Sequence, residues 1–172
     1  MQFSGMVYRA HKPEWSFSPL SGAGASYNGG RFNPVGTPAL YTALSPITAL
    51  SEYHQKFPSR PQPTMLCAYK VDCQDIVDLR DPDELKQHGI DASDLSCAWE
   101  YQSNTGITPP SWEIAITLIK INITGIIVPS FAEKRQDNDG NLIFWKWGGD
   151  LPHQVLLIDD DDRLPKNRDS WG

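Results

Sequence analysis

Short strand-like segments separated by turn-forming residues run through most of this 172-residue chain, and they restrict its fold more than any other feature. A chain of this length can bury roughly 70% of its unfolded surface, so a core needs no metal or disulfide. The pattern predicts one α+β domain, with a strongly twisted, mostly antiparallel sheet and flanking helices. Strands are predicted over Gly5–His11, Pro38–Ala43, Thr64–Val71, Ile76–Leu79, Ile126–Val128, Leu142–Trp147 and Val155–Ile158, leaving a polar, frayed tail over 159–172.

Helix signals interrupt this series. Ser45 suits an N-cap and Pro46 the first helical position, so a helix is predicted from Ser45 to about Phe57, where Pro58 stops it. Further helices are predicted from Asp81-Pro82 to Gly89 and over Ser111–Ile119. The apolar face of the first helix would comprise Ile47, Leu50 and Phe57, with His54 as a hydrogen-bonded core histidine.

Residues 13–33 are predicted to be a long irregular stretch rich in Pro and Gly. Loops of this length inside a compact domain tend to be functional or disordered. This one carries several large apolar side chains, so we expect it to form the wall of a pocket. Those side chains are Trp15, Phe17, Leu20 and Tyr27.

Charge and cysteine content restrict the partners and the compartment. A net charge of −6 and a pI near 5.1 argue against direct nucleic-acid binding. Cys67, Cys73 and Cys97 lack the spacing of a zinc or redox motif, the histidines lack metal-ligand spacing, and no metal is predicted. With neither a leader-like start nor a membrane-length apolar run, the sequence predicts a cytoplasmic protein without membrane contact.

The most informative motif is Gly29-Gly30-Arg31. The glycines would let the backbone approach a ligand closely, and arginine presents a fork of donors suited to phosphate. The same residues also fit an ordinary turn with a solvated arginine. Glu52 falls nearly opposite the predicted apolar helix face, so it is either a surface residue or faces the Gly-rich stretch. Arg9, in the first strand, is either a phosphate contact or part of a structural ion pair.

A wider pattern connects these residues. The run GGRFNPVGTPALYTALSPITALSE, from Gly29 to Glu52, resembles the Gly-Gly-Arg segment and the glutamate helix of the RES domain, a family named for Arg, Glu and Ser. YRAH at Tyr8–His11, GIIVPSFA at Gly125–Ala132 and DGNLIFW at Asp139–Trp145 resemble further segments of that family, in the same order. The resemblance covers about residues 5–158.

The resemblance implies the toxin of a type II toxin–antitoxin pair, with a fold similar to ADP-ribosyltransferases and NAD as its substrate. The family's catalytic Arg, Glu and Ser match Arg31, Glu52 and Ser130, and its motif tyrosine matches Tyr41. Arg31, Tyr41 and Ser130, with Arg9, would also bind NAD. Two departures stand out: Phe32 replaces the usual tryptophan, and Ser111-Trp112-Glu113 replaces a glutamine-containing helix start.

By the same resemblance, Glu52 would stabilise positive charge on the ribose, Arg31 would hold the pyrophosphate, Tyr41 would contact nicotinamide or ribose, and Ser130 would fix the pose of the substrate. The acceptor of the ADP-ribosyl group is left open between water, phosphate and a protein. A third, non-enzymatic hypothesis is a binding module that uses the same pocket to sense a nucleotide. The implied partner is an Xre-type helix-turn-helix antitoxin. We also expect self-association through exposed aromatic surface, as a homodimer within a larger complex.

Overall fold

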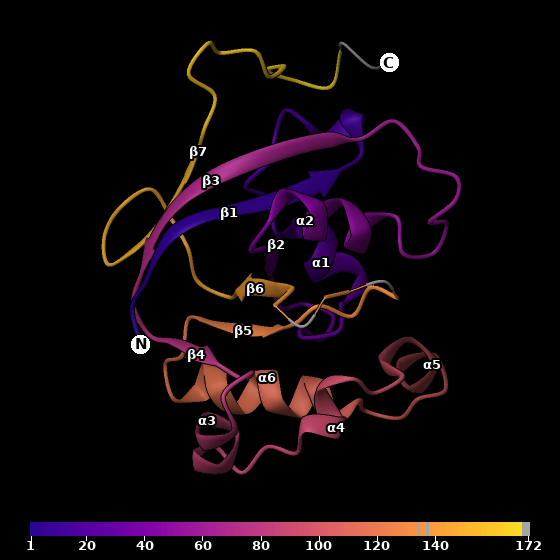
Figure 1. The fold of residues 1–172 in the computed structure, drawn as a ribbon, viewed down its shortest axis with the longest axis vertical. Coiled ribbons are helices and arrows are strands. Elements are labelled where there is room, and N and C mark those ends of the chain that lie inside the picture. Colours follow the sequence, from indigo (N-terminus) through magenta and orange to yellow (C-terminus); the bar gives the residue numbers. More distant parts are fainter. Residues whose placement is uncertain (134, 137, 170–172) are drawn as a thin grey trace.

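The structure is a computed structural model that describes residues 1–133, 135–136 and 138–169 (Figure 1). Within these residues one seven-stranded sheet has the order β4-β5-β6-β2-β1-β3-β7. Neighbouring strands are antiparallel except for the parallel pair β4–β5. The predicted α+β class and mostly antiparallel sheet are therefore confirmed. The strands are β1 (Phe3–His11), β2 (Leu40–Ala43), β3 (Met65–Cys73), β4 (Ile76–Asp78), β5 (Gly125–Pro129), β6 (Gly140–Phe144) and β7 (His153–Leu157).

The helices follow the predicted start signals. Ser45 Oγ accepts the Thr48 backbone N–H at 3.0 Å, and a proline opens the helix that follows. Four short helical segments, within residues 13–28 and 92–104, were not predicted, because one or two turns are too short to show a helical period. The helices are η1 (Pro13–Trp15), α1 (Ala23–Asn28), α2 (Pro46–Tyr53), α3 (Pro82–Gln87), α4 (Ala92–Leu95), α5 (Trp99–Asn104) and α6 (Pro110–Lys120).

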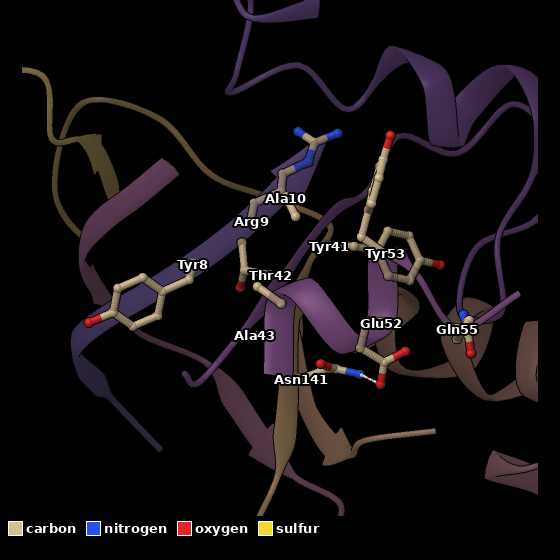
Figure 2. Close-up of a pocket in the computed structure, with 11 residues that line it drawn as sticks. Tyr8, Arg9, Ala10, Tyr41, Thr42, Ala43, Glu52, Tyr53, Gln55 and Asn141 are labelled. Atoms are coloured by element: carbon tan, nitrogen blue, oxygen red, sulfur yellow. Dashed lines mark hydrogen bonds between the residues drawn. The ribbon is translucent and has the colours of Figure 1, made fainter. Parts of the chain in front are cut away.

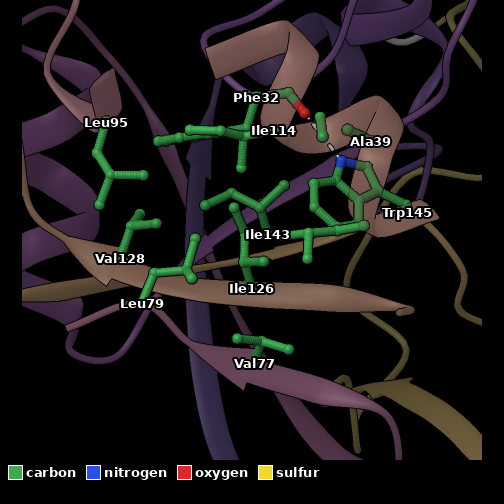
Figure 3. Packing of buried hydrophobic residues seen from close by; sticks show 12 residues of the cluster. Phe32, Ala39, Val77, Leu79, Leu95, Ile114, Ile126, Val128, Ile143 and Trp145 are labelled. Atoms are coloured by element: carbon green, nitrogen blue, oxygen red, sulfur yellow. Dashed lines mark hydrogen bonds between the residues drawn. The ribbon is translucent and has the colours of Figure 1, made fainter. Parts of the chain in front are cut away.

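Strands β5 and β6 lie at the centre of the packing, because both of their faces are buried. Ile126 and Ile143 pack on one side with Leu118 of α6, in the cluster that Figure 3 shows in part. Leu142 and Phe144 point to the opposite side and join a second cluster of buried residues from β1 and β3. Because each face of β6 packs against its own cluster of buried residues, the direction of every side chain along this strand is fixed.

The prediction for the face of α2 was wrong. Ile47 is 76% exposed, and Phe57 lies beyond the helix end at Tyr53 and is 66% exposed. The buried side chains are instead Thr48 and Ala49. The physical reason is close approach: α2 packs across β1 and β2, where small side chains let a helix backbone come near a sheet. The side of the helix that carries Glu52 therefore turns toward the protein.

Two expectations about irregular segments also need correction. Residues 13–33 are not a continuous loop, since they contain η1 and α1. The described part of the tail, 159–169, is anchored at its start, whereas 170–172 lie outside the described residues. The Asp159 carboxylate accepts the backbone N–H groups of Arg163 and Leu164 at 2.8 and 3.0 Å, and Leu164 packs against the second cluster. Among the described residues, no helix has the length and apolar character needed to cross a membrane.

Candidate active site

Two adjoining cavities, each of about 300 Å³, lie between α2, the sheet and the segment around Arg31. They share four lining residues, Tyr41, Glu52, Gln55 and Asn141, and together form one cleft with Glu52 at its middle. Their combined size is within the usual range for small-molecule sites. The first cavity, shown in Figure 2, is also lined by Tyr8, Arg9, Thr42 and Tyr53, and the second by Arg31, Phe32, Trp99 and Phe131.

One oxygen of the Glu52 carboxylate is held by three donors. Its Oε1 accepts Ser130 Oγ–H at 2.6 Å, the Phe131 backbone N–H at 2.8 Å and Asn141 Nδ2–H at 2.7 Å. Figure 2 shows the Asn141 bond, with the second carboxylate oxygen directed away from Asn141. Hydrogen bonds to an ionised carboxylate are short and strong. Glu52 is thus held in one orientation at the cleft, and it is not a surface residue.

Arg31 lies on the wall of the second cavity. Its Nη1 donates to the Cys97 backbone carbonyl at 2.7 Å, and its guanidinium lies 4.3 Å from the centre of the Phe131 ring. Burial lowers the pKa of this guanidinium, while Cys97 and Glu52 nearby raise it, and arginine stays charged in proteins. Within the described residues no carboxylate forms an ion pair with it. Its positive charge is therefore available to an anionic ligand.

Tyr41 contributes its ring to both cavities, whereas its hydroxyl is already engaged. The Tyr41 hydroxyl donates to Asn33 Oδ1 at 2.7 Å and accepts the Phe32 backbone N–H at 2.9 Å. Burial raises the pKa of this phenol well above its usual value. Of the two roles expected for Tyr41, a flat contact surface fits this geometry better than a free hydroxyl.

Ser130 and Arg9 lie close to the cleft in different ways. Ser130 is fully buried, and it reaches the cleft only through its bond to Glu52. Arg9 Nη1 donates to the backbone carbonyls of Pro19 and Ser21, each at 3.0 Å, and burial lowers the pKa of its guanidinium. Arg9 therefore anchors the segment before α1 and borders the first cavity. Substrate contacts by either residue stay predictions.

The structure also places residues at the cleft that the sequence analysis did not single out as site residues. Asn141 could have been noticed as the one amide within the otherwise apolar β6, and its Oδ1 is buried without a partner in the described part of the chain. Gln55, Trp99 and Phe131 carry no comparable signal, because they come from a turn, a short helix and the irregular segment after β5. The ring of His54 bonds the backbone of Leu50 and Gln62, so it is hydrogen-bonded as predicted, but it is half-buried at the end of α2 and does not belong to the core. Across the described ranges, no group of three or more His, Cys, Asp or Glu side chains is arranged to hold a metal.

Comparison with solved structures finds the same fold in a toxin–antitoxin complex. A chain from the crystal structure of the M. tuberculosis MbcT-MbcA toxin-antitoxin complex superposes with a TM-score of 0.61 at 20% sequence identity, covering 92% of this chain and 84% of that one. No curated protein matches the sequence. The family model of the RES domain matches residues 6–167, nearly the whole chain, and includes every residue of the cleft. The chain belongs to the RES-domain family.

Proposed function

We propose that this protein is the toxin of a toxin–antitoxin pair and that it cleaves the bond between nicotinamide and ribose in NAD. The observation that carries the proposal is the Glu52 carboxylate, held through one oxygen by three donors in a cleft that it shares with Arg31. The cleft thus offers a fixed negative charge beside an available positive charge. NAD presents the complementary pair, since positive charge develops on its ribose during cleavage and its pyrophosphate is anionic.

In this reaction the bond from ribose C1′ to the nicotinamide nitrogen breaks, and its electron pair neutralises the pyridinium. The ribose is left with oxocarbenium character, which the Glu52 carboxylate would stabilise electrostatically. The oxygen of the acceptor then bonds to C1′, and its proton is released. With water as the acceptor, the products are nicotinamide, ADP-ribose and a proton. Arg31 would hold the pyrophosphate, and the rings of Tyr41 and Phe131 provide apolar surface for the substrate.

The test is incubation of the purified protein with NAD and quantification of nicotinamide by chromatography. Glu52→Gln keeps the shape of the side chain and removes its charge, so kcat should fall on the order of 10²- to 10³-fold. Arg31→Ala should mainly raise KM, because it removes a contact made in both ground and transition states. Glu113→Gln, at an exposed position of α6, is the matched control and should behave as the unmodified protein.

Absence of nicotinamide above background would refute the proposal. If labelled NAD instead transfers label to a protein with little free product, the enzyme is an ADP-ribosyltransferase that uses the same cleft. An NAD-consuming cytoplasmic enzyme must be restrained in its own cell, so we expect a helix-turn-helix antitoxin of the Xre type to cover the cleft. Co-expression with the product of a neighbouring reading frame should then suppress nicotinamide release.

A further inference from the structure

The backbone on both sides of Arg31 is held by three aromatic side chains from separate parts of the fold. Trp112 Nε1–H of α6 donates to the Gly30 carbonyl at 2.7 Å. Trp145 Nε1–H, directly after β6, donates to the Phe32 carbonyl at 2.8 Å, a bond that Figure 3 shows. The Tyr41 hydroxyl of β2 accepts the Phe32 N–H at 2.9 Å. We propose that Trp112, Tyr41 and Trp145 form an aromatic clamp that positions Arg31 for its ligand, an inference that rests on the proposed function.

The glycines before Arg31 make room for this clamp. A Cβ on Gly30 would lie 2.5 Å from the Tyr41 hydroxyl oxygen and 2.6 Å from Asn33 Oδ1. Gly29 has a φ of +72°, and a Cβ there would lie 3.1 Å from Cζ2 of Trp112. The two glycines thus bring the backbone against the protein's own aromatic side chains. Both glycines also line the second cavity, so the predicted close approach of this backbone to a ligand stays a prediction.

The backbone of Arg31 belongs to no regular element, so its position depends on contacts with other segments. The guanidinium itself donates through Nη1 to the Cys97 and Leu95 carbonyls, at 2.7 and 3.5 Å, and stacks on Phe131. A flexible arginine would lose conformational entropy when it binds an anion, which weakens binding. Indole and phenol side chains have only two rotatable bonds, so three of them hold a segment at low entropic cost. The clamp therefore fixes the backbone from which the Arg31 side chain extends toward its ligand.

Trp112 is the member of the clamp best suited to a test. Trp145 is only 8% exposed and belongs to the core, so its replacement would also disturb core packing. Trp112→Phe removes the N–H donor and keeps an aromatic ring. Trp147→Phe is the matched control, since Trp147 Nε1 donates to the Leu20 carbonyl at 3.0 Å and Trp147 lines neither cavity of the cleft.

The first measurement is hydrogen exchange by mass spectrometry, which needs no ligand. Backbone amides over residues 29–33 should exchange roughly three- to tenfold faster in Trp112→Phe than in the unmodified protein, as expected for the loss of one hydrogen bond. Trp147→Phe should leave them unchanged. Unchanged exchange in Trp112→Phe overturns the clamp, whether or not the protein cleaves NAD. Absence of cleavage by the unmodified protein would instead refute the proposed function, so the two failures are distinguishable.

The second measurement separates positioning from a general structural role. Trp112→Phe should raise the KM for NAD roughly three- to tenfold with kcat changed less than about twofold, because Arg31 binds a part of the substrate that does not react. In an Arg31→Ala background, Trp112→Phe should have no further effect on the Kd of ADP-ribose, measured by calorimetry. Faster exchange with unchanged KM, or additive losses in the double variant, would overturn the positioning role.

Discussion

Replacing Ser130 by alanine removes one of the three donors that hold Glu52. The Ser130 Oγ–H bond to Glu52 Oε1 is 2.6 Å long and lies in a fully buried position. A hydrogen bond to a charged group contributes about 1.5–3 kcal/mol. Because each 1.36 kcal/mol changes a rate tenfold, loss of this bond should lower kcat about 10- to 100-fold if the carboxylate must be fixed for the reaction. KM should change little, since the contacts of Arg31 are untouched.

The assay is steady-state release of nicotinamide from NAD, with urea unfolding to verify that the variant is folded. Asn141→Ala removes a donor at 2.7 Å from the same oxygen and should give a comparable loss. The double variant should lose less than the product of the two single losses, because both act on one group. Ser16→Ala is the control, as this buried hydroxyl has no partner in the described part of the chain. A fall in kcat of less than about threefold in Ser130→Ala would refute an orienting role for Ser130.

Two further predictions concern stability. His11 is 7% exposed, and its pKa is lowered to about 4 by burial and by repulsion from Arg9. As the pH falls, the His11 imidazole is protonated in the unfolded chain before it is protonated in the folded protein. The free energy of unfolding therefore decreases as the pH drops from about 6.5 toward 4, by up to about 3 kcal/mol. In His11→Leu, the free energy of unfolding measured in urea should lack this pH-dependent decrease. An identical pH dependence in the variant and the unmodified protein would contradict the assignment to His11. Gly30→Ala should destabilise by about 1–3 kcal/mol through overpacking against Tyr41 and Asn33, whereas Gly24→Ala, with nothing within 4 Å, should be neutral or stabilising in the same assay.

The sequence predicted best the elements whose side chains carry their own local signal. Alternating, β-branched and aromatic-rich runs predicted the strands, and Ser45 with Pro46 predicted the start of α2 to the residue. The face of α2 was mispredicted because hydrophobicity alone decided it. Ile47 looked like a core residue, yet the sheet lies too close for a large side chain, so Ala49 packs there and Ile47 is exposed. Tertiary packing overrode the helical wheel.

The candidate site was predicted as a set of residues, whereas its bonding depends on contacts between distant segments. Glu52 receives its donors from positions 78 to 89 residues away, and a periodicity argument contains no information about such pairs. The family resemblance supplied the membership of Arg31, Tyr41, Glu52 and Ser130, and the structure brings all four to the cleft or directly behind it. Their individual roles in NAD cleavage stay predictions.

Strand β6 links the two charged groups of the cleft. Its odd-numbered side chains share one face, so Asn141, Ile143 and Trp145 point to the same side of the sheet. Asn141 holds Glu52, Ile143 lines the second cavity, and Trp145 holds the backbone beside Arg31. Pairing with β2 sets Tyr41 opposite Ile143. A one-residue slip of β6 would turn all of these side chains away at once, and the burial of both faces of β6 prevents such a slip. The packing of the core thus determines where the carboxylate lies relative to the guanidinium.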